Sequence, residues 1–377
     1  MSTAAAPDTQ AAVLVSLDIG GETREDAAEE LARLAESAGV LRHVTVRGRR
    51  PRPDPKFYCG SGKVAEIGRE AATLNAAWVL FNHNLSPAQA RNLEVELKCR
   101  VLDRTDLILE IFSQRAQTHE GKIQVELARL EHLSTRLVRG WTHLERQRGG
   151  LGKTGGPGEK QIELDRRYIA KRVRVLRDKL DTLRKQRTVQ RRARSRRDVL
   201  SVSLVGYTNA GKSSLFNALT RAGAYEADQL FATLDTTTRR VWLPGAGPVV
   251  LSDTVGFIRE LPHGLVAAFR ATLEETVHAD LLLHVVDSAS PVRDAQAAEV
   301  DKVLADIGAG DIPQILVWNK ADSSGLAPGV ERDEYGRIHR VFVSARTGAG
   351  LAELRGAVAE AAQARQTRNP SPEPISL

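Results

Sequence analysis

The chain has 377 residues, of which 42% are hydrophobic, which is more than one ordinary core holds, so we expect two or three domains. Its net charge of +7 favours a polyanionic partner. Its two cysteines, Cys59 and Cys99, form no C-x-x-C pair or histidine cluster, which argues against a disulfide scaffold or a structural zinc site. This cysteine usage indicates a cytoplasmic protein. No apolar run approaches about 18 residues, and residues 1–10 lack a signal pattern, so we expect no membrane span and a disordered N-terminus.

Strand-like and helix-like segments alternate along the first hundred residues. The strands are expected at 12–19, 43–46, 77–82 and 100–102, and the helices at 24–38, 62–72 and 86–97. Ser86 is the predicted N-cap of the last helix, with Pro87 at its first position. The alternation predicts a small parallel-sheet α/β domain over residues 11–105.

Within this domain, the segment Gly-Ser-Gly-Lys at 60–63 resembles part of a phosphate-binding loop. However, Phe57 occupies the position of the required first glycine, and Val64 stands where Ser or Thr should follow. We therefore favour a turn that leads into a helix.

The middle of the chain, residues 106–199, is predicted to form an antiparallel helical hairpin. A short helix is expected at 105–116, before the two long helices of the hairpin. Two stretches carry apolar residues at steps of three and four. The first contains Ile123, Leu127, Leu130, Leu133 and Leu137, and the second contains Ile162, Ile169, Val173, Leu176, Leu180 and Leu183. A polar, glycine-rich connection at 147–160 joins them.

This connection also imitates a phosphate loop at 152–154, but Gln147 holds the first glycine position and no strand precedes it. We favour a mobile basic loop, because the cations and aromatics that flank it suit contact with folded RNA. The alternative, a solvated hairpin tip without a partner, stays open. The flanking residues are Arg139, Trp141, His143, Arg146 and Arg148.

A dense cationic run at 184–197 ends the second helix. Few acidic residues neutralise it, which favours contact with phosphate over a charged linker helix. Its cations are Arg184, Lys185, Arg187, Arg191, Arg192, Arg194, Arg196 and Arg197.

The strongest motif lies at 206–213, where Gly-Tyr-Thr-Asn-Ala-Gly-Lys-Ser matches G-x-x-x-x-G-K-[ST]. An apolar strand at 200–205 precedes it and a helix follows at 214–220, which is the context that a phosphate-binding loop needs. In this pattern Lys212 reaches the β- and γ-phosphates, and the Ser213 hydroxyl holds Mg²⁺.

Three further motifs each follow a predicted strand. Asp-Thr-Val-Gly at 253–256 follows the strand at 249–252, and Asn-Lys-Ala-Asp at 319–322 follows the strand at 315–318. Ser-Ala-Arg at 344–346 follows the strand at 341–343, and another strand is expected at 281–286. In the second motif the Asp322 carboxylate would accept hydrogen bonds from guanine, which adenine cannot donate. The order predicts a doubly wound sheet with a GTP site at the carboxyl ends of its strands.

Residues 200–366 resemble a translation-factor-class P-loop GTPase domain, in which residues 231–235 match the first switch. The whole chain, from about residue 11 to 366, resembles the HflX family of ribosome-associated GTPases. The stretches that carry this likeness are 57–64, 113–116, 119–122, 124–127, 135–145, 156–160 and 165–167.

The resemblance implies a monomeric, cytoplasmic GTPase that binds the large (50S) ribosomal subunit, with its 23S rRNA contacted near the peptidyl-transferase region. In its GTP form it would split stalled or idle 70S ribosomes under stress. Residues 367–377 would form a flexible tail. Some relatives also hydrolyse ATP through the N-terminal region, and this stays open. Two other hypotheses are an RNA-binding scaffold with a nucleotide-sensing GTPase domain and an RNA-remodelling ATPase.

The resemblance and the motifs together give a set of expected site residues. The expected catalytic residues are Lys212, Thr233 and Gly256, and the expected Mg²⁺ ligands are Ser213 and Thr233. The expected GTP- or GDP-binding residues are Gly206, Tyr207, Thr208, Asn209, Ala210, Gly211, Lys212, Ser213, Phe231, Ala232, Thr233, Leu234, Asp235, Asp253, Thr254, Val255, Gly256, Asn319, Lys320, Ala321, Asp322, Ser344, Ala345 and Arg346.

Two positions bear on the hydrolysis step. Phe257 stands where related GTPases carry a glutamine that orients the attacking water, so we expect slow hydrolysis that the large subunit stimulates. Asn209 matches the asparagine that coordinates K⁺ in potassium-dependent relatives, with a simple loop hydrogen bond as the alternative.

Overall fold

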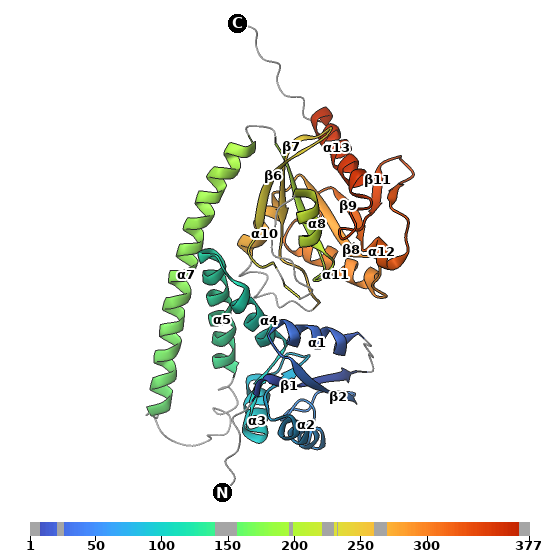
Figure 1. Ribbon diagram of the computed structural model, residues 1–377. Helices are drawn as coiled ribbons and strands as arrows, with labels where there is room; N and C mark the ends of the chain where they lie inside the picture. The colour runs from blue at the N-terminus through green and yellow to red at the C-terminus, as the bar shows by residue number, and fades with distance from the viewer. Residues whose placement is uncertain are drawn as a thin grey trace. The chain divides into compact units, whose positions relative to one another are not determined.

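The computed structural model describes residues 8–20, 26–139, 157–195, 199–220, 230–231, 233–259 and 270–368. The chain divides into two compact units, Met1–Asp181 and Thr182–Leu377, which Figure 1 shows in blue to green and in yellow-green to red. Both units contain a mainly parallel sheet covered by helices, so the predicted α/β class is confirmed.

The first unit is built on a four-stranded parallel sheet with the order β2-β1-β3-β4. The strands are β1 (Asp8–Ile19), β2 (Arg42–Arg50), β3 (Ala76–Phe81) and β4 (Arg100–Leu102). The central strand β1 is apolar on both faces because helices cover both sides of the sheet, and Val13, Leu14 and Val15 are fully buried. β1 begins at Asp8, so residues 8–10 belong to a strand and not to the predicted disordered terminus.

Three helices connect these strands: α1 (Ala27–Ser37), α2 (Ser61–Leu74) and α3 (Pro87–Leu97). The predicted start of α3 is confirmed in detail. Ser86 Oγ accepts from the Gln89 backbone N–H at 3.3 Å, and Gln89 Oε1 accepts from the Ser86 N–H at 2.9 Å. This reciprocal pair satisfies two backbone donors at the helix start.

Helices α4 (Arg104–Arg115), α5 (His119–Arg139) and α7 (Pro157–Ser195) follow the sheet. α5 and α7 contact each other through two ion pairs, Arg172 with Glu126 at 2.7 Å and Arg177 with Glu131 at 2.6 Å. Both predicted long helices are therefore present and paired, and most of the predicted connection between them lies outside the described residues. The first unit holds α4, α5 and the part of α7 up to Asp181 together with the sheet, so a boundary near residue 105 stays a prediction.

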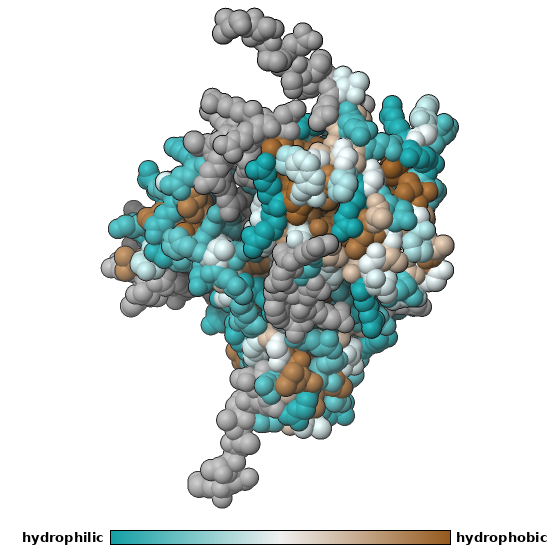
Figure 2. All heavy atoms as spheres, turned by 45° about the horizontal axis from the view of Figure 1, so that its top comes forward, coloured by the Kyte–Doolittle hydropathy of each residue, from teal (hydrophilic) through white to brown (hydrophobic). Residues whose placement is uncertain are grey.

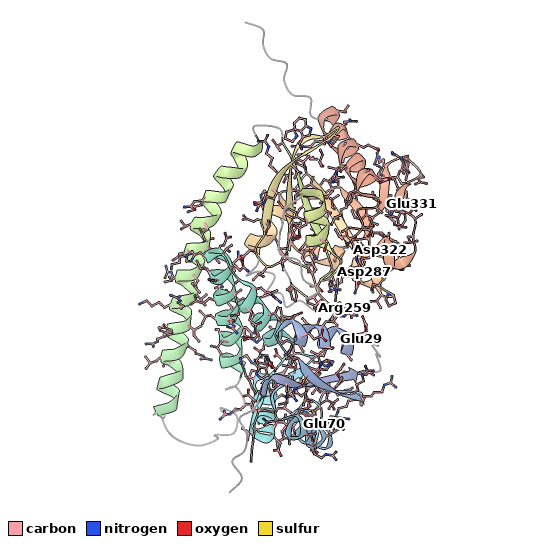
Figure 3. All side chains as sticks on the ribbon, viewed as in Figure 1. Glu29, Glu70, Arg259, Asp287, Asp322 and Glu331 are labelled. Atoms are coloured by element: carbon pink, nitrogen blue, oxygen red, sulfur yellow. The ribbon has the colours of Figure 1, made fainter. Side chains whose placement is uncertain are left out.

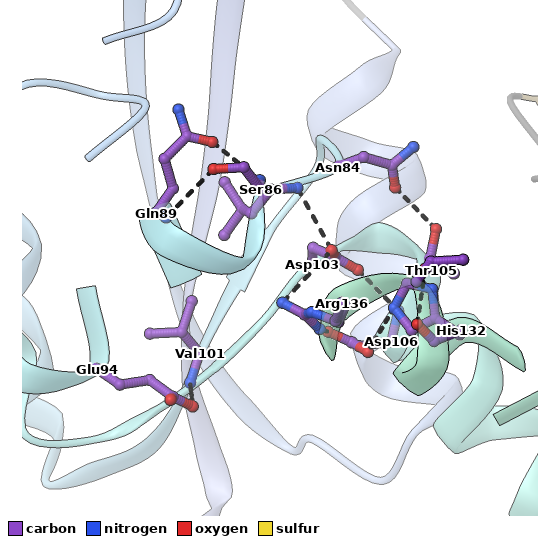
Figure 4. Close-up of polar contacts among 12 residues, drawn as sticks. Asn84, Ser86, Gln89, Glu94, Val101, Asp103, Thr105, Asp106, His132 and Arg136 are labelled. Atoms are coloured by element: carbon purple, nitrogen blue, oxygen red, sulfur yellow. Dashed lines mark hydrogen bonds and ion pairs between the residues drawn. The ribbon is translucent and has the colours of Figure 1, made fainter. Parts of the chain in front are cut away.

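A polar cluster fastens α4 to α5 (Figure 4). The Asp103 side chain caps α4 by accepting from the Asp106 N–H at 2.9 Å, and Asp106 forms an ion pair with Arg136 of α5. The Nε2 atom of His132 lies 3.1 Å from Asp106 Oδ1. Burial alone would raise the pKa of the Asp106 carboxyl, but the hydrogen bond from His132 and the charge of Arg136 outweigh burial and lower it.

The second unit contains a seven-stranded sheet with the order β10-β11-β9-β8-β5-β7-β6. The five inner strands are parallel to one another, and the edge strands β6 and β10 are antiparallel to their neighbours. The strands are β5 (Leu200–Gly206), β6 (Thr237–Leu243), β7 (Gly247–Asp253), β8 (Leu281–Asp287), β9 (Gln314–Asn319), β10 (Gly329–Arg332) and β11 (Ile338–Phe342). The parallel strands aim their carboxyl ends at one edge of the sheet, where a ligand site is expected.

The described helices of this unit are α8 (Lys212–Thr220), α10 (Arg270–Val277), α11 (Arg293–Asp306), α12 (Ala321–Ser324) and α13 (Leu351–Arg368). Phe216 of α8 and Leu354 of α13 are fully buried against the sheet core. α13 continues to Arg368, six residues beyond its predicted end, so the predicted tail starts within the helix. Along the described chain, no helix is long and apolar enough to cross a membrane, and hydrophilic residues cover much of the visible face in Figure 2.

Candidate nucleotide-binding site

The sequence motifs of the second unit meet at the carboxyl edge of its sheet. The phosphate loop joins β5 to α8, and its Thr208 N–H donates to the Phe257 carbonyl at 2.7 Å. Asn319 Nδ2 donates to the Ala210 carbonyl at 3.0 Å, and Asn319 Oδ1 accepts from the Ala345 N–H at 3.0 Å. Direct hydrogen bonds therefore join segments that lie more than a hundred residues apart.

Lys212 lies at the centre of this arrangement. Its ammonium donates to the carbonyls of Gly206 and Tyr207 at 3.1 and 2.8 Å, so the loop curls around its own lysine. Burial lowers the pKa of Lys212 to about 8, and the charge of Asp253 offsets this effect in part. A buried ammonium whose charge is offset only in part by one carboxylate suits an anionic ligand such as a nucleotide phosphate.

Three oxygen-bearing side chains gather beside Lys212. The Ser213 hydroxyl lies 2.7 Å from Thr233 Oγ1 and donates to Asp253 Oδ2 at 2.7 Å, and Thr233 donates to the same oxygen at 3.0 Å. Asp253 Oδ1 is buried and finds no hydrogen-bond partner among the described residues. Burial raises the pKa of the Asp253 carboxyl. An orphaned carboxylate oxygen beside two hydroxyls fits a hard divalent cation such as Mg²⁺.

Two glycines stand where the motifs approach each other most closely. A Cβ on Gly211, which has a φ of +89°, would lie 2.2 Å from Asn319 Nδ2. A Cβ on Gly256 would lie 2.9 Å from Thr208 Cα and 3.0 Å from the Lys212 ammonium. Any other residue at Gly211 would push residues 319–322, the predicted guanine motif, away from the phosphate loop. Any other residue at Gly256 would do the same to the 253–256 segment.

The segment predicted as the first switch is described except for Ala232. Phe231 and Leu234 are buried, and Phe231 adopts a φ of +57°. Thr233 lies between these two buried residues and contacts Ser213 and Asp253 through its hydroxyl. The structure thus brings the predicted threonine to the predicted metal site.

At the guanine motif, the Lys320 ammonium donates to Asp287 Oδ2 at 2.8 Å, and Asp322 is exposed at the start of α12. Figure 3 labels both carboxylates. Ser344 is buried and accepts from the Thr347 N–H at 3.2 Å, and Arg346 is exposed.

Three further residues contribute contacts that the motifs do not indicate. The backbone of Phe257 bonds to the phosphate loop at Gly206 and Thr208, and its side chain is 1% exposed. Asp287, the last residue of β8, and Ser288, which follows it, hold Lys320 and Asn319 by hydrogen bonds. Their position directly after a predicted apolar strand is a signal that could have identified them.

Comparison with known proteins agrees with this geometry. Residues 25–113 match a family model described as "GTP-binding GTPase N-terminal", residues 115–194 match "GTP-binding GTPase Middle Region", and residues 201–320 match "50S ribosome-binding GTPase". A solved structure titled as SsGBP in complex with GDP superposes with a TM-score of 0.52 at 25% identity, covering 94% of this chain and 99% of that one.

Two curated relatives are similar over most of their length. The GTPase HflX of Escherichia coli (strain K12) is 52% identical over 93% of this chain and 82% of that protein. The GTPase HflX of Magnetococcus marinus is 50% identical over 88% of this chain and 78% of that protein. Because this identity spans most of each protein, the chain belongs to the HflX family of GTPases, and it is an enzyme that binds guanine nucleotide and hydrolyses GTP.

Proposed function

We propose that this GTPase uses its nucleotide state to control binding to the large ribosomal subunit and separates the subunits of stalled or idle 70S ribosomes under stress. The observation that carries the proposal is the convergence of Thr233, Ser213 and Asp253, because it is the arrangement through which a GTPase senses the γ-phosphate. The family model described as a 50S ribosome-binding GTPase supports the partner.

The RNA contact is proposed for the long helices and the basic segments at their ends, close to the peptidyl-transferase region of the 23S rRNA. On α7, Tyr168 is 72% exposed among cations that also face solvent. Aromatic rings and guanidinium groups together suit unpaired bases and phosphates. The exposed cations are Arg166, Arg167, Lys171, Arg174, Arg177, Lys179 and Lys185. The glycine-rich part of the proposed surface lies outside the described residues.

At the nucleotide site, Ser213 and Thr233 would hold Mg²⁺ directly, with Asp253 positioned to accept hydrogen bonds from its water ligands. The cation would supply charge neutralisation of the phosphates. Lys212 would contact the β- and γ-phosphates, and Asp322 would accept from guanine. The remaining motif residues would shape the walls of the same pocket.

The switch would work by a population shift. Contacts from the γ-phosphate to Thr233 and to the N–H of Gly256 would stabilise one arrangement of the switch segments, and hydrolysis would release them. The arrangement with GTP would be the one that binds the large subunit.

The hydrolysis step itself should depend on the ribosome. The Phe257 side chain is apolar and 1% exposed, so it cannot orient a water molecule as a glutamine does. We therefore propose slow turnover by the free protein and stimulation by the large subunit. A K⁺ ion held by Asn209 is a further prediction, tested by comparing turnover in K⁺ and Na⁺ buffers.

Sedimentation of 70S ribosomes with the protein and GTP, GDP or a non-hydrolysable GTP analogue tests the proposal. We expect subunits to separate with GTP and with the analogue, and not with GDP. The Lys212→Ala variant should leave the 70S peak intact in every case. Equal splitting by that variant, or by the GDP form, would contradict the proposal.

A further inference from the structure

The ends of β8 and β9 are joined by side-chain contacts that lie next to the guanine motif. Asp287, the last residue of β8, stands opposite Asn319 in the register of the two strands. One oxygen of its carboxylate, Oδ2, accepts from the Lys320 ammonium at 2.8 Å, and the other, Oδ1, accepts from the Ala289 N–H at 3.0 Å. Because each oxygen has its own donor, the orientation of the carboxylate is fixed.

The next residue, Ser288, holds the backbone of the same motif. Its N–H and its hydroxyl both donate to the Asn319 carbonyl, at 3.0 and 2.7 Å. The same hydroxyl lies 2.8 Å from the hydroxyl of Ser324 in α12, the short helix that carries Asp322. Ser288 is 1% exposed, so these hydrogen bonds are shielded from competing water.

The arrangement matters most for Lys320. This residue adopts a φ of +63°, which directs its side chain away from the course of the strand, and about 31% of that side chain is exposed. A lysine with a free stem would lose rotamer freedom when it covered a nucleotide base. The ion pair with Asp287 restricts the stem before the nucleotide arrives, which lowers this entropic cost of binding.

We infer that Asp287 is a positioning residue for guanine nucleotide, which holds Lys320 in the orientation that covers the base or the sugar. Ser288 supports it by fixing Asn319 and α12. The inference rests on the proposed assignment of residues 319–322 as the guanine site. It extends that site to a carboxylate on a neighbouring strand that would not itself touch the nucleotide.

The test is the dissociation constant of a fluorescent GDP for the full-length Asp287→Asn variant. Asparagine keeps the size of the side chain and an acceptor for the Ala289 N–H but loses the charge that holds Lys320. We expect about fivefold weaker binding, in the range measured for partly exposed ion pairs, with the unfolding temperature of the nucleotide-free protein close to that of wild type. Asp311→Asn, at an exposed carboxylate of the same unit, is the matched control and should bind like wild type.

A double-mutant cycle separates a positioning role from a general loss of structure. In a Lys320→Ala background, the Asp287→Asn change should have no further effect on the dissociation constant. The inference is overturned if Asp287→Asn binds GDP like the control, or if its effect persists in full without Lys320. If Lys320→Ala and Asp322→Ala also bind GDP like wild type, the proposed guanine site fails together with it.

Discussion

At the scale of single residues, the buried ammonium of Lys212 dominates the electrostatics of the site. It is the cation that a phosphate would meet, and burial has lowered its pKa to about 8 from a usual value of 10.5. A bound phosphate would favour the charged form and raise that pKa again. Binding of nucleotide and binding of a proton to Lys212 are therefore coupled.

We expect GDP binding to take up a proton at pH 8.5, where part of Lys212 is neutral in the free protein, and to take up little at pH 7. The terminal phosphate, whose pKa is about 6, does not titrate in this interval. GDP affinity should accordingly fall as the pH rises above about 8. Titration calorimetry in two buffers of different ionisation heat measures the uptake. Equal heats in both buffers at pH 8.5 would contradict this account of Lys212.

Gly256 should be intolerant of even one added carbon. Gly256→Ala places a Cβ against the Thr208 backbone and the Lys212 ammonium, so we expect a loss of about 1–3 kcal/mol in the free energy of unfolding and impaired GTP turnover. Gly356→Ala is the control, because Gly356 lies in α13 with open space around it. That change should stabilise the protein by about 0.5–1 kcal/mol. Denaturant unfolding of both variants measures the difference, and two changes of the same sign would refute the argument from close approach.

At the scale of elements, the contact between α4 and α5 depends on Arg136. Its guanidinium pairs with Asp106 and lies 3.9 Å from Asp103, two carboxylates that would otherwise repel each other. Burial raises the pKa of Asp103, and the nearby Asp106 charge adds to this. Removal of the arginine would leave these two neighbouring carboxylates without their guanidinium partner.

We expect Arg136→Leu to lower the free energy of unfolding by about 2 kcal/mol at pH 7, because it leaves a carboxylate pair without its cation. The lowered pKa of Asp106 means that the wild-type pair stabilises the fold above the ordinary pKa and loses this contribution as the pH falls through the folded value. The difference in unfolding free energy between wild type and Arg136→Leu should therefore become smaller as the pH is lowered. Arg129→Leu, which removes a more exposed partner of Glu110, should cost less than about 1 kcal/mol. A loss of unfolding free energy in Arg136→Leu that does not change with pH would contradict this role of the Arg136 ion pair.

The sequence predicted some elements well because their local signals agree with their burial. β1 contains a largely apolar run, and α3 carries a complete capping box. Other elements have no such signal. β6 and β10 are edge strands with exposed polar residues, and α11 lacks a side-chain N-cap and buries only Val300, Val303 and Leu304.

For the site, the sequence predicted the motif residues and their meeting at one edge, because phosphate and guanine recognition require those residue types at fixed spacings. It did not predict Asp287, Ser288 or the backbone role of Phe257. Their contacts depend on how β8 and the segment after β7 pack beside the phosphate loop. The apolar strand before Asp287 and Ser288 indicates where these two residues lie but not which partners they contact.

At the scale of the whole molecule, GTP hydrolysis is expected to depend on the large ribosomal subunit. Turnover should rise at least about tenfold when purified large subunits are added, because the buried, apolar Phe257 side chain cannot position water as a glutamine there would. Small subunits serve as the control and should have little effect. A turnover number that is the same with and without large subunits would remove the proposed stimulation.

The most direct test of the account is the dissociation constant of the protein for purified large subunits, measured with a non-hydrolysable GTP analogue and with GDP, for wild type and for Thr233→Ala. The account predicts that wild type binds at least about tenfold more tightly with the analogue, a difference of about 1.4 kcal/mol, and that Thr233→Ala abolishes this preference while still binding GDP. Equal affinity of wild type in the two nucleotide states would contradict it.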